Sequence, residues 1–260
     1  MLHFVDPNAR IDWATVCDWV HYDRQDEMTF LLDTLETASG PVLEIGCNVG
    51  GLTSLLANHG LQVCAVDPSK VMLNVARNRI EDSEIISRVA FKELNFSEIE
   101  QLSGQQYGLV LVPSNSFMSV LDPKDQELFL SNVAKLLVPG GALILVNATP
   151  QLRWLVADPA VNYHYKDVVK EDGQRLILST QSDYDDHTQL GEIRVYSEFL
   201  REDGVVIKKI VHNIYYRLTY AREMHNLLKL CGFSNVEVYG DFDKKPPGVN
   251  STSMVWVGRF

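Results

Sequence analysis

A run of small residues directly after a short apolar stretch is the part of the sequence best suited to hold a ligand. Val42–Ile45 predicts a buried strand, and Gly46–Gly51 predicts a tight loop that leads into a helix. Such a loop lets a ligand approach the backbone closely. Asp67 follows about twenty residues after Gly46, at the predicted end of the next strand. A carboxylate placed there can accept hydrogen bonds from both hydroxyls of an adenosine ribose.

Two cofactor classes fit this geometry, NAD(P) and S-adenosylmethionine (SAM), and position 48 favours the second. A pyrophosphate over the turn favours glycine at the later fingerprint positions, because a Cβ there would stand where the phosphate must sit. Asn48 occupies such a position. SAM carries no phosphate, and Asn is among the few non-glycine residues that readily adopt positive φ. The alternative without a ligand is a tight structural turn with a solvated Asp67.

Residues that could act on a methyl acceptor are scattered. A sulfonium already activates its methyl group, so transfer mainly requires the acceptor lone pair to be held in line with the methyl and the sulfur. A base is needed only where the acceptor must first lose a proton. The candidates by residue type are His21, His164, His212, Tyr163 and Tyr165. We favour His164, which falls in a long connection after the fifth strand, although each candidate could equally pack or face solvent.

Short apolar runs that alternate with amphipathic helices predict the scaffold for these residues. The predicted strands are 42–45, 61–66, 89–91, 109–112 and 143–146. Helices are predicted at 23–38, at 51–58, after Ser69 and from Pro123 onwards. This alternation is typical of an α/β fold with a mostly parallel sheet and helices on both faces. Ligands bind such sheets at the carboxyl ends of the strands.

After about residue 150 the pattern changes to long strands. The runs 175–183, 189–201 and 205–217 are joined by polar turns and predict an antiparallel insertion. The second run alternates apolar and polar residues from Glu192 to Phe199, which predicts one buried and one solvated face. We expect this insertion to cover the acceptor as a lid. Dimerisation through the sheet, or a sheet that only covers the core, fits the same pattern.

The composition fits one main domain and disfavours several classes of protein. A chain of 260 residues with 46% apolar composition can bury a good-sized core without disulfides or metals. The formal net charge of −11 argues against a nucleic-acid partner. The four cysteines are scattered, which argues against a zinc site and indicates reduced thiols. No stretch has the length and apolarity of a signal peptide or a membrane span, so we expect a cytoplasmic protein.

Several motifs together resemble the class I SAM-dependent methyltransferases over nearly the whole chain, and more narrowly their bacterial small-molecule branch. They are Tyr22-Asp23, Glu44–Gly51, Val66–Ser69, Leu94–Phe96, Val112–Phe117, Leu137–Gly141, Tyr216–Tyr220, Gly232-Phe233 and Tyr239–Asp241. The resemblance implies a Rossmann-like fold with a mostly parallel seven-stranded sheet and an antiparallel insertion after the fifth strand.

The resemblance also implies a cofactor site. Its members would be Tyr22, Glu44, Gly46, Cys47, Asn48, Gly50, Asp67, Pro68, Met72, Asn95, Phe96, Val112 and Phe117. In this site Glu44 and the Gly46–Gly50 backbone support the methionyl part, and Asp67 takes the ribose hydroxyls. Met72, Asn95 and Phe96 lie at the adenine. Asn48 replaces the usual middle glycine, and Asn95 replaces the usual acid. On the acceptor side the implied residues are Arg217, Tyr165 and Asn115.

The function implied is methyl transfer from SAM to N, O or C of a small-molecule acceptor, without a metal, nucleic acid or membrane. We expect a single domain over 1–260, as a monomer or homodimer. Its parts would be an N-terminal helical cap (1–40), a SAM-binding core (41–150), an antiparallel lid (151–218) and a C-terminal helix with the last strands (219–260). The alternatives are a SAM-binding protein without methyl transfer, such as a cyclase, and, less favoured, an NAD(P)-dependent oxidoreductase.

Overall fold

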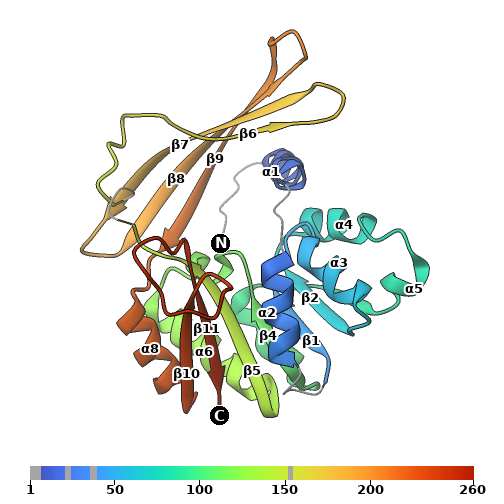
Figure 1. Cartoon of the computed structure of the whole chain (residues 1–260), viewed down its shortest axis with the longest axis vertical. Helices are drawn as coiled ribbons and strands as arrows, with labels where there is room; N and C mark the ends of the chain where they lie inside the picture. Colours follow the sequence, from blue (N-terminus) through green and yellow to red (C-terminus); the bar gives the residue numbers. More distant parts are fainter. Residues whose placement is uncertain (1–6, 21–24, 36–39, 152–154) are drawn as a thin grey trace. The chain divides into compact units, whose positions relative to one another are not determined.

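The computed structural model describes residues 7–20, 25–35, 40–151 and 155–260 of the chain. These residues form two compact units, one made of Asp23–Thr149 with Thr219–Phe260 and the other of Met1–Tyr22 with Pro150–Leu218. We call them the core unit and the antiparallel unit (Figure 1). The N-terminal segment predicted as one helical cap contributes α1 (Pro7–Trp19) to the antiparallel unit and α2 (Gln25–Leu35) to the core unit.

The core unit is built on a seven-stranded sheet in the order β10-β11-β5-β4-β1-β2-β3. The first five strands of the chain pair in parallel, and β11 runs antiparallel to both of its neighbours. The strands are β1 (Val42–Ile45), β2 (Val63–Asp67), β3 (Val89–Glu93), β4 (Tyr107–Val112), β5 (Leu137–Ala148), β10 (Asn235–Gly240) and β11 (Ser253–Arg259). The predicted fold class is therefore confirmed.

Helices cover both faces of this sheet (Figure 1). On one face α2, α3 (Gly51–Asn58) and α4 (Lys70–Asn78) pack against side chains of β1, β2 and β4. On the other face the 3-10 helix η1 (Phe96–Leu102), α6 (Pro123–Leu136) and α8 (Ala221–Leu230) enclose a second core. Short elements, α5 (Ser83–Ile86) and η2 (Ser116–Ser119), connect the strands. The strand order runs from β1 through β2 to β3 on one side of β1 and continues with β4 and β5 on the other side. The order therefore reverses between β1 and β4, and α/β sheets bind ligands at such a point.

The antiparallel unit is a four-stranded sheet in the order β6-β7-β8-β9. Its strands are β6 (Tyr163–Val169), β7 (Arg175–Asp185), β8 (Leu190–Leu200) and β9 (Val206–Arg217). One face packs against α1, since Val16 and Trp19 share a core with Val195, Phe199 and Ile210. The predicted alternation along β8 is confirmed: Val195, Ser197 and Phe199 are buried, whereas Arg194 on the other face is exposed.

The antiparallel unit has one strand more than the sequence analysis predicts. The sequence analysis places His164 in a long connection, but Tyr163–Val169 form the edge strand β6, with a bulge between His164 and Lys166. Four of its seven residues carry aromatic or β-branched side chains, which suit a pleated edge. Most of them are exposed, so no apolar alternation marks the strand. The pairing with β7 therefore determines its conformation.

Candidate active site

The loop after β1 turns sharply through three residues with positive φ. Gly46 has φ 87°, Asn48 has φ 53° and Gly50 has φ 74°. Only glycine and, to a lesser degree, asparagine adopt such angles at low cost, which explains the residue types at these three positions. Gly50 is also the N-cap of α3, so the loop delivers the chain directly into a helix at the carboxyl end of β1. The predicted strand, loop and helix are confirmed here.

Every backbone N–H from Gly46 to Gly50 has a partner within the protein. Gly46 and Cys47 donate to the carbonyl of Val66 at 2.8 and 3.0 Å, and Gly50 donates to the carbonyl of Cys47. The N–H of Asn48 donates to Oδ2 of Asp67 at 3.0 Å, and the N–H of Val49 donates to the side-chain Oδ1 of Asn48 at 2.8 Å. A pyrophosphate would need such N–H groups free, so this loop is closed to the dinucleotide mode of binding.

Gly46 is also required by close packing. A Cβ on Gly46 would lie 2.3 Å from Oγ of Ser116 and 3.9 Å from Cζ of Phe96. These residues begin η2 and η1, which follow β4 and β3. The segments after β1, β3 and β4 therefore meet at Gly46, at the edge where the carboxyl ends of the parallel strands lie.

Asp67 ends β2 and is buried beside the loop. Its two carboxylate oxygens each accept one backbone N–H, Oδ1 from Ser69 at 2.9 Å and Oδ2 from Asn48 at 3.0 Å. Burial raises the pKa of Asp67 from 3.8 to about 6, against the lowering effect of these two hydrogen bonds. Since each oxygen has two lone pairs, each can accept one further donor. The side chain can thus receive two neighbouring hydroxyls.

Glu44 is a second buried carboxylate, on the neighbouring strand β1. Its Oε2 accepts the hydroxyl of Thr53 on α3 at 2.6 Å. The pKa of the buried Cys47 thiol is raised well above its ordinary value, first by burial and then by the charges of Glu44 and Asp67. Cys47 is therefore a neutral thiol in a region of negative potential, and the region favours a cationic ligand.

The residues predicted at the adenine lie along the same edge. Met72 is buried in the first turn of α4, where its N–H donates to the side chain of the N-cap Ser69 at 3.4 Å. Asn95 is the N-cap of η1. Phe96 packs edge-to-face on Phe129, with ring centroids 5.5 Å apart. Pro68 connects Asp67 to the cap.

Val112 and Phe117 are placed deeper than a lining role suggests. Both side chains are completely buried. Phe117 packs on Phe129, with ring centroids 5.7 Å apart, in the core that η1 and α6 cover. Asn115 stands between them at the N-cap of η2 with φ 64°, and its N–H donates to the carbonyl of Val146. Their contact with a ligand stays a prediction.

The remaining candidates lie elsewhere. Tyr22 and His21 fall outside the described residues. His164 and Tyr165 are exposed on β6, with Nε2 of His164 3.7 Å from the carboxylate of Asp167. Arg217 is buried at the end of β9 and donates to the side chain of Gln189. These three described residues belong to the antiparallel unit, whereas Asp67 belongs to the core unit.

Three residues of the site are not among the site residues that the sequence predicts: Thr53, which donates to Glu44; Ser116, which packs on Gly46; and Glu98, which accepts from Asn95. For Glu98 a signal was present, because Asn followed three residues later by Glu is the pattern of a capping box. For Thr53 and Ser116 the contact depends on the tertiary fold, and no local pattern marks it.

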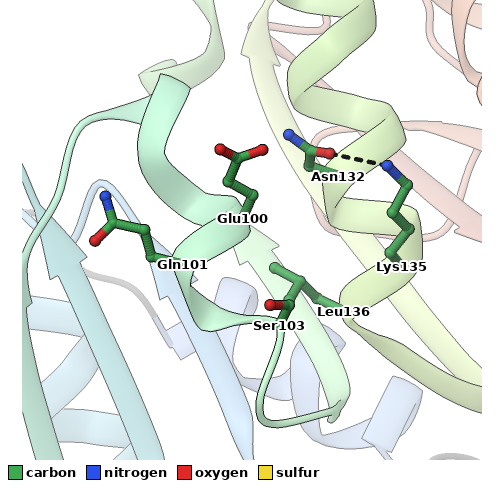
Figure 2. A pocket seen from close by; sticks show the side chains of 6 residues that line it. All are labelled: Glu100, Gln101, Ser103, Asn132, Lys135 and Leu136. Atoms are coloured by element: carbon green, nitrogen blue, oxygen red, sulfur yellow. Dashed lines mark hydrogen bonds between the residues drawn. The ribbon is translucent and has the colours of Figure 1, made fainter.

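Figure 2 shows a surface hollow between η1 and α6. It is lined by Glu100, Gln101, Ser103, Asn132, Lys135 and Leu136, and Nζ of Lys135 donates to Oδ1 of Asn132 at 3.2 Å. Leu136 directly precedes β5, and Ser103 precedes β4. The hollow therefore lies toward the amino ends of these strands, away from the loop and Asp67.

In the described part of the chain, no helix is both long and apolar enough to cross a membrane.

Comparisons with known proteins agree with this geometry. Residues 42–141 match the family model for a methyltransferase domain. The chain is 28% identical over 153 residues to glycine N-methyltransferase of Mus musculus, covering 54% of this chain and 52% of that protein. It is 29% identical over 155 residues to the ubiquinone biosynthesis O-methyltransferase of Xanthomonas euvesicatoria, covering 55% and 62%. The matches thus span about half to three fifths of these curated relatives.

Solved structures share the fold over most of the chain. The CcbJ methyltransferase from Streptomyces caelestis superposes with a TM-score of 0.71 at 21% identity, covering 92% of this chain and 96% of that one. The amino pentose methyltransferase CalS10 from Micromonospora echinaspora, solved with SAM bound, gives a TM-score of 0.70 at 14% identity, covering 100% and 99%. Residues 42–141 thus match a methyltransferase domain, and the chain shares the fold of these SAM-dependent methyltransferases over most of its length.

Proposed function

We propose that the chain transfers the methyl group of SAM to a nitrogen, oxygen or carbon atom of a small-molecule acceptor. The observation that carries the proposal is the buried Asp67 carboxylate, which keeps one acceptor site on each oxygen beside a loop whose N–H groups are all used internally. Two ribose hydroxyls can use these acceptor sites, whereas a pyrophosphate finds no donor in the loop. The names of the relatives, a glycine N-methyltransferase and ubiquinone O-methyltransferases, support a small acceptor.

The residues present fit SAM. Asp67 would take the ribose hydroxyls, and the loop from Gly46 to Gly50 with Glu44 would support the methionyl end. Asn95, Phe96 and Met72 would flank the adenine. The side chain of Asn48 does not block this fit, because it folds onto its own loop and accepts the N–H of Val49 at 2.8 Å. The negative potential from the two buried carboxylates suits the sulfonium and ammonium of SAM.

When bound, SAM supplies a methyl group already activated by a positively charged sulfur. The protein's own contribution is orientation. Asp67 and the loop after β1 hold the two ends of the cofactor on rigid strand termini, which limits the directions in which the methyl group can point. Orientation of this kind is worth roughly 7 to 11 kcal/mol for well-aligned reactants.

We propose that the acceptor side includes His164 as a base, with Arg217, Tyr165 and Asn115 as binding residues. The exposed imidazole of His164 beside Asp167 supports a proton-accepting role, since both groups are open to a ligand. Arg217 is held by Gln189 and is buried, which favours a fixed guanidinium over a mobile one.

Replacing Arg217 by Ala should raise the Michaelis constant for the acceptor or SAM at least about fivefold, because a charge-assisted hydrogen bond is lost. Steady-state kinetics measures this. Arg201→Ala is the matched control, since Arg201 pairs with Asp203 in an exposed turn, at 2.8 Å. Kinetics unchanged in Arg217→Ala would exclude the role.

The direct test is transfer of a labelled methyl group from SAM to a mixture of small metabolites. Labelled product should form with the wild-type chain and fall at least about tenfold with Asp67→Ala, because a charged acceptor contributes roughly 1.5 to 3 kcal/mol per hydrogen bond. If SAM binds and no labelled product forms, the proposed methyl transfer is contradicted, but the proposed SAM binding stands. Calorimetric heat with NADH and none with SAM would overturn the whole proposal.

A further inference from the structure

Asn95 follows β3, the strand that pairs with β2 up to Asp67. Asp67 pairs with Glu93 at the end of β3, and Asn95 follows two residues later. The next residue, Phe96, comes within 3.9 Å of the position that a Cβ on Gly46 would take. The segment after β3 that begins with Asn95 and Phe96 therefore reaches the glycine loop, at the same sheet edge as Asp67.

Glu98 fixes which way the amide of Asn95 faces. Oε2 of Glu98 accepts both the backbone N–H of Asn95 at 2.8 Å and the side-chain Nδ2 of Asn95 at 2.7 Å. The pKa of Glu98 is lowered by these two bonds, the backbone one first, so the carboxylate is ionised at neutral pH. An ionised carboxylate accepts hydrogen bonds and cannot donate them. The Asn95 nitrogen must therefore face the Glu98 carboxylate, and its carbonyl oxygen, which takes part in the capping box with the backbone N–H of Glu98, is the atom that can still accept.

We propose that Glu98 is a positioning residue that makes Asn95 an acceptor toward the cofactor base, and so selects a 6-amino purine over a 6-oxo purine. The inference rests on the proposed function. An amide free to turn over could offer either oxygen or nitrogen to the ligand, but the Glu98 carboxylate leaves only the oxygen. That oxygen has two lone pairs, so it can accept from a ligand amine even where a neighbouring backbone N–H uses one.

The same contact explains why residue 95 is an amide in this chain. An aspartate there would bring a second carboxylate within hydrogen-bonding distance of Glu98, and two like charges so close cannot both ionise without cost. Asparagine supplies the donor that Glu98 requires and keeps an acceptor for the ligand. The residue types at 95 and 98 therefore depend on each other.

Calorimetry with two ligands tests the proposal, S-adenosylhomocysteine and its deaminated analogue S-inosylhomocysteine. The wild-type chain should bind the adenosyl compound at least about tenfold more tightly, which corresponds to about 1.4 kcal/mol. In Glu98→Ala this ratio should fall at least about threefold, because Asn95 can turn its nitrogen to the 6-oxo group. Glu98→Gln should keep the ratio, since its carbonyl oxygen can still accept both N–H groups.

Glu100→Ala is the matched control on the same 3-10 helix. Glu100 is exposed, lines the hollow of Figure 2 and lies outside the bonds that hold Asn95, so its removal should leave the ratio unchanged. A purely structural cap predicts something else: Glu98→Ala would lower the melting temperature and weaken both ligands equally. A wild-type ratio in Glu98→Ala would therefore overturn the proposal.

A second pair of variants tests the idea independently. Asn95→Asp should bind S-adenosylhomocysteine at least about fivefold more weakly than the wild type, because of the repulsion between residues 95 and 98. Asn95→Asp combined with Glu98→Gln should recover most of this loss, since the glutamine can donate to the new carboxylate. A double variant no tighter than Asn95→Asp would refute the coupling. A wild-type chain that binds neither ligand would instead remove the proposed function, and this inference with it.

Discussion

The raised pKa of Asp67 should make cofactor affinity depend on pH below neutrality. Burial raises this pKa from 3.8 to about 6 in the ligand-free protein. Because each carboxylate oxygen already accepts one backbone N–H, the side chain can accept two ribose hydroxyls only when it is ionised. A proton on Asp67 therefore competes with the ligand. Binding should weaken as the pH falls through about 6.

The size of the effect follows from linkage. For a single group with a pKa of about 6, the dissociation constant of S-adenosylhomocysteine should be about tenfold higher at pH 5 than at pH 7. At pH 5 binding should release close to one proton. Asp67→Asn cannot titrate, so its affinity should be weaker at pH 7 by roughly tenfold or more and should change little between pH 5 and 7.

Calorimetry at pH 5, 6 and 7, in two buffers of different ionisation enthalpy, measures both the affinity and the protons released. Asp67→Asn is the matched control, because it retains every other titrating group of the protein and the ligand. A wild-type affinity that stays constant from pH 5 to pH 7 would refute the reasoning. An equal loss of affinity from pH 7 to pH 5 in Asp67→Asn would also refute it, because the titration would then belong to another group.

The same shift acts on the stability of the ligand-free protein with the opposite sign. A carboxyl whose pKa is raised on folding holds its proton more tightly in the folded state, so its contribution to stability is present below about pH 4 and is lost as the pH rises to about 6. A shift of about two pH units corresponds to about 3 kcal/mol. The free energy of unfolding of the wild type, measured relative to Asp67→Asn, should therefore decline by about this amount between pH 4 and 7.

Two substitutions, one in each unit, test the packing of the protein. Gly46→Ala should destabilise the core unit by roughly 1 to 3 kcal/mol more than Gly60→Ala, because both residues have positive φ but only at position 46 would the added Cβ meet Ser116. Equal losses in denaturant unfolding would contradict this. Trp19→Ala should cost about 3 kcal/mol or more, since its ring is buried against the antiparallel sheet, whereas the exposed Ile207→Ala should stay within about 0.5 kcal/mol. A small loss at Trp19 would show that α1 contributes little to that unit.

The core unit could be predicted from sequence because its strands are buried on both faces. Four-residue β1 and five-residue β2 read as uninterrupted apolar runs apart from the carboxylates Glu44 and Asp67. Turn residues mark the ends of these strands, and Ser69 and Pro123 mark the starts of α4 and α6. Burial, helix capping and positive φ are local properties, so the positions of the site's glycines and of Asp67 could be read from local sequence.

Pairing between distant segments could not be predicted in the same way. β6 is mostly exposed and gains its conformation from β7, so its residues resemble a polar loop. Thr53 and Ser116 reach the site only after α3 and η2 have packed. Their side chains are ordinary hydroxyls, and nothing within a few residues of either distinguishes them from hydroxyls in solvent.

Asn48 and Asn95, which depart from the pattern of the family that the chain resembles, each take part in a local hydrogen bond through the side chain. Asn48 adopts φ 53° and accepts the N–H of Val49, so it stabilises the turn that a glycine would otherwise make. Asn95 donates to Glu98, a contact that the usual acid would turn into a repulsion. A site that had lost its ligand would be under no constraint to keep such partners. The variants at positions 95 and 98 are therefore also a test of whether these asparagines are adaptations of a working cofactor site: if the adenosyl ligand binds and the double variant restores affinity, the residues at 95 and 98 act as one unit.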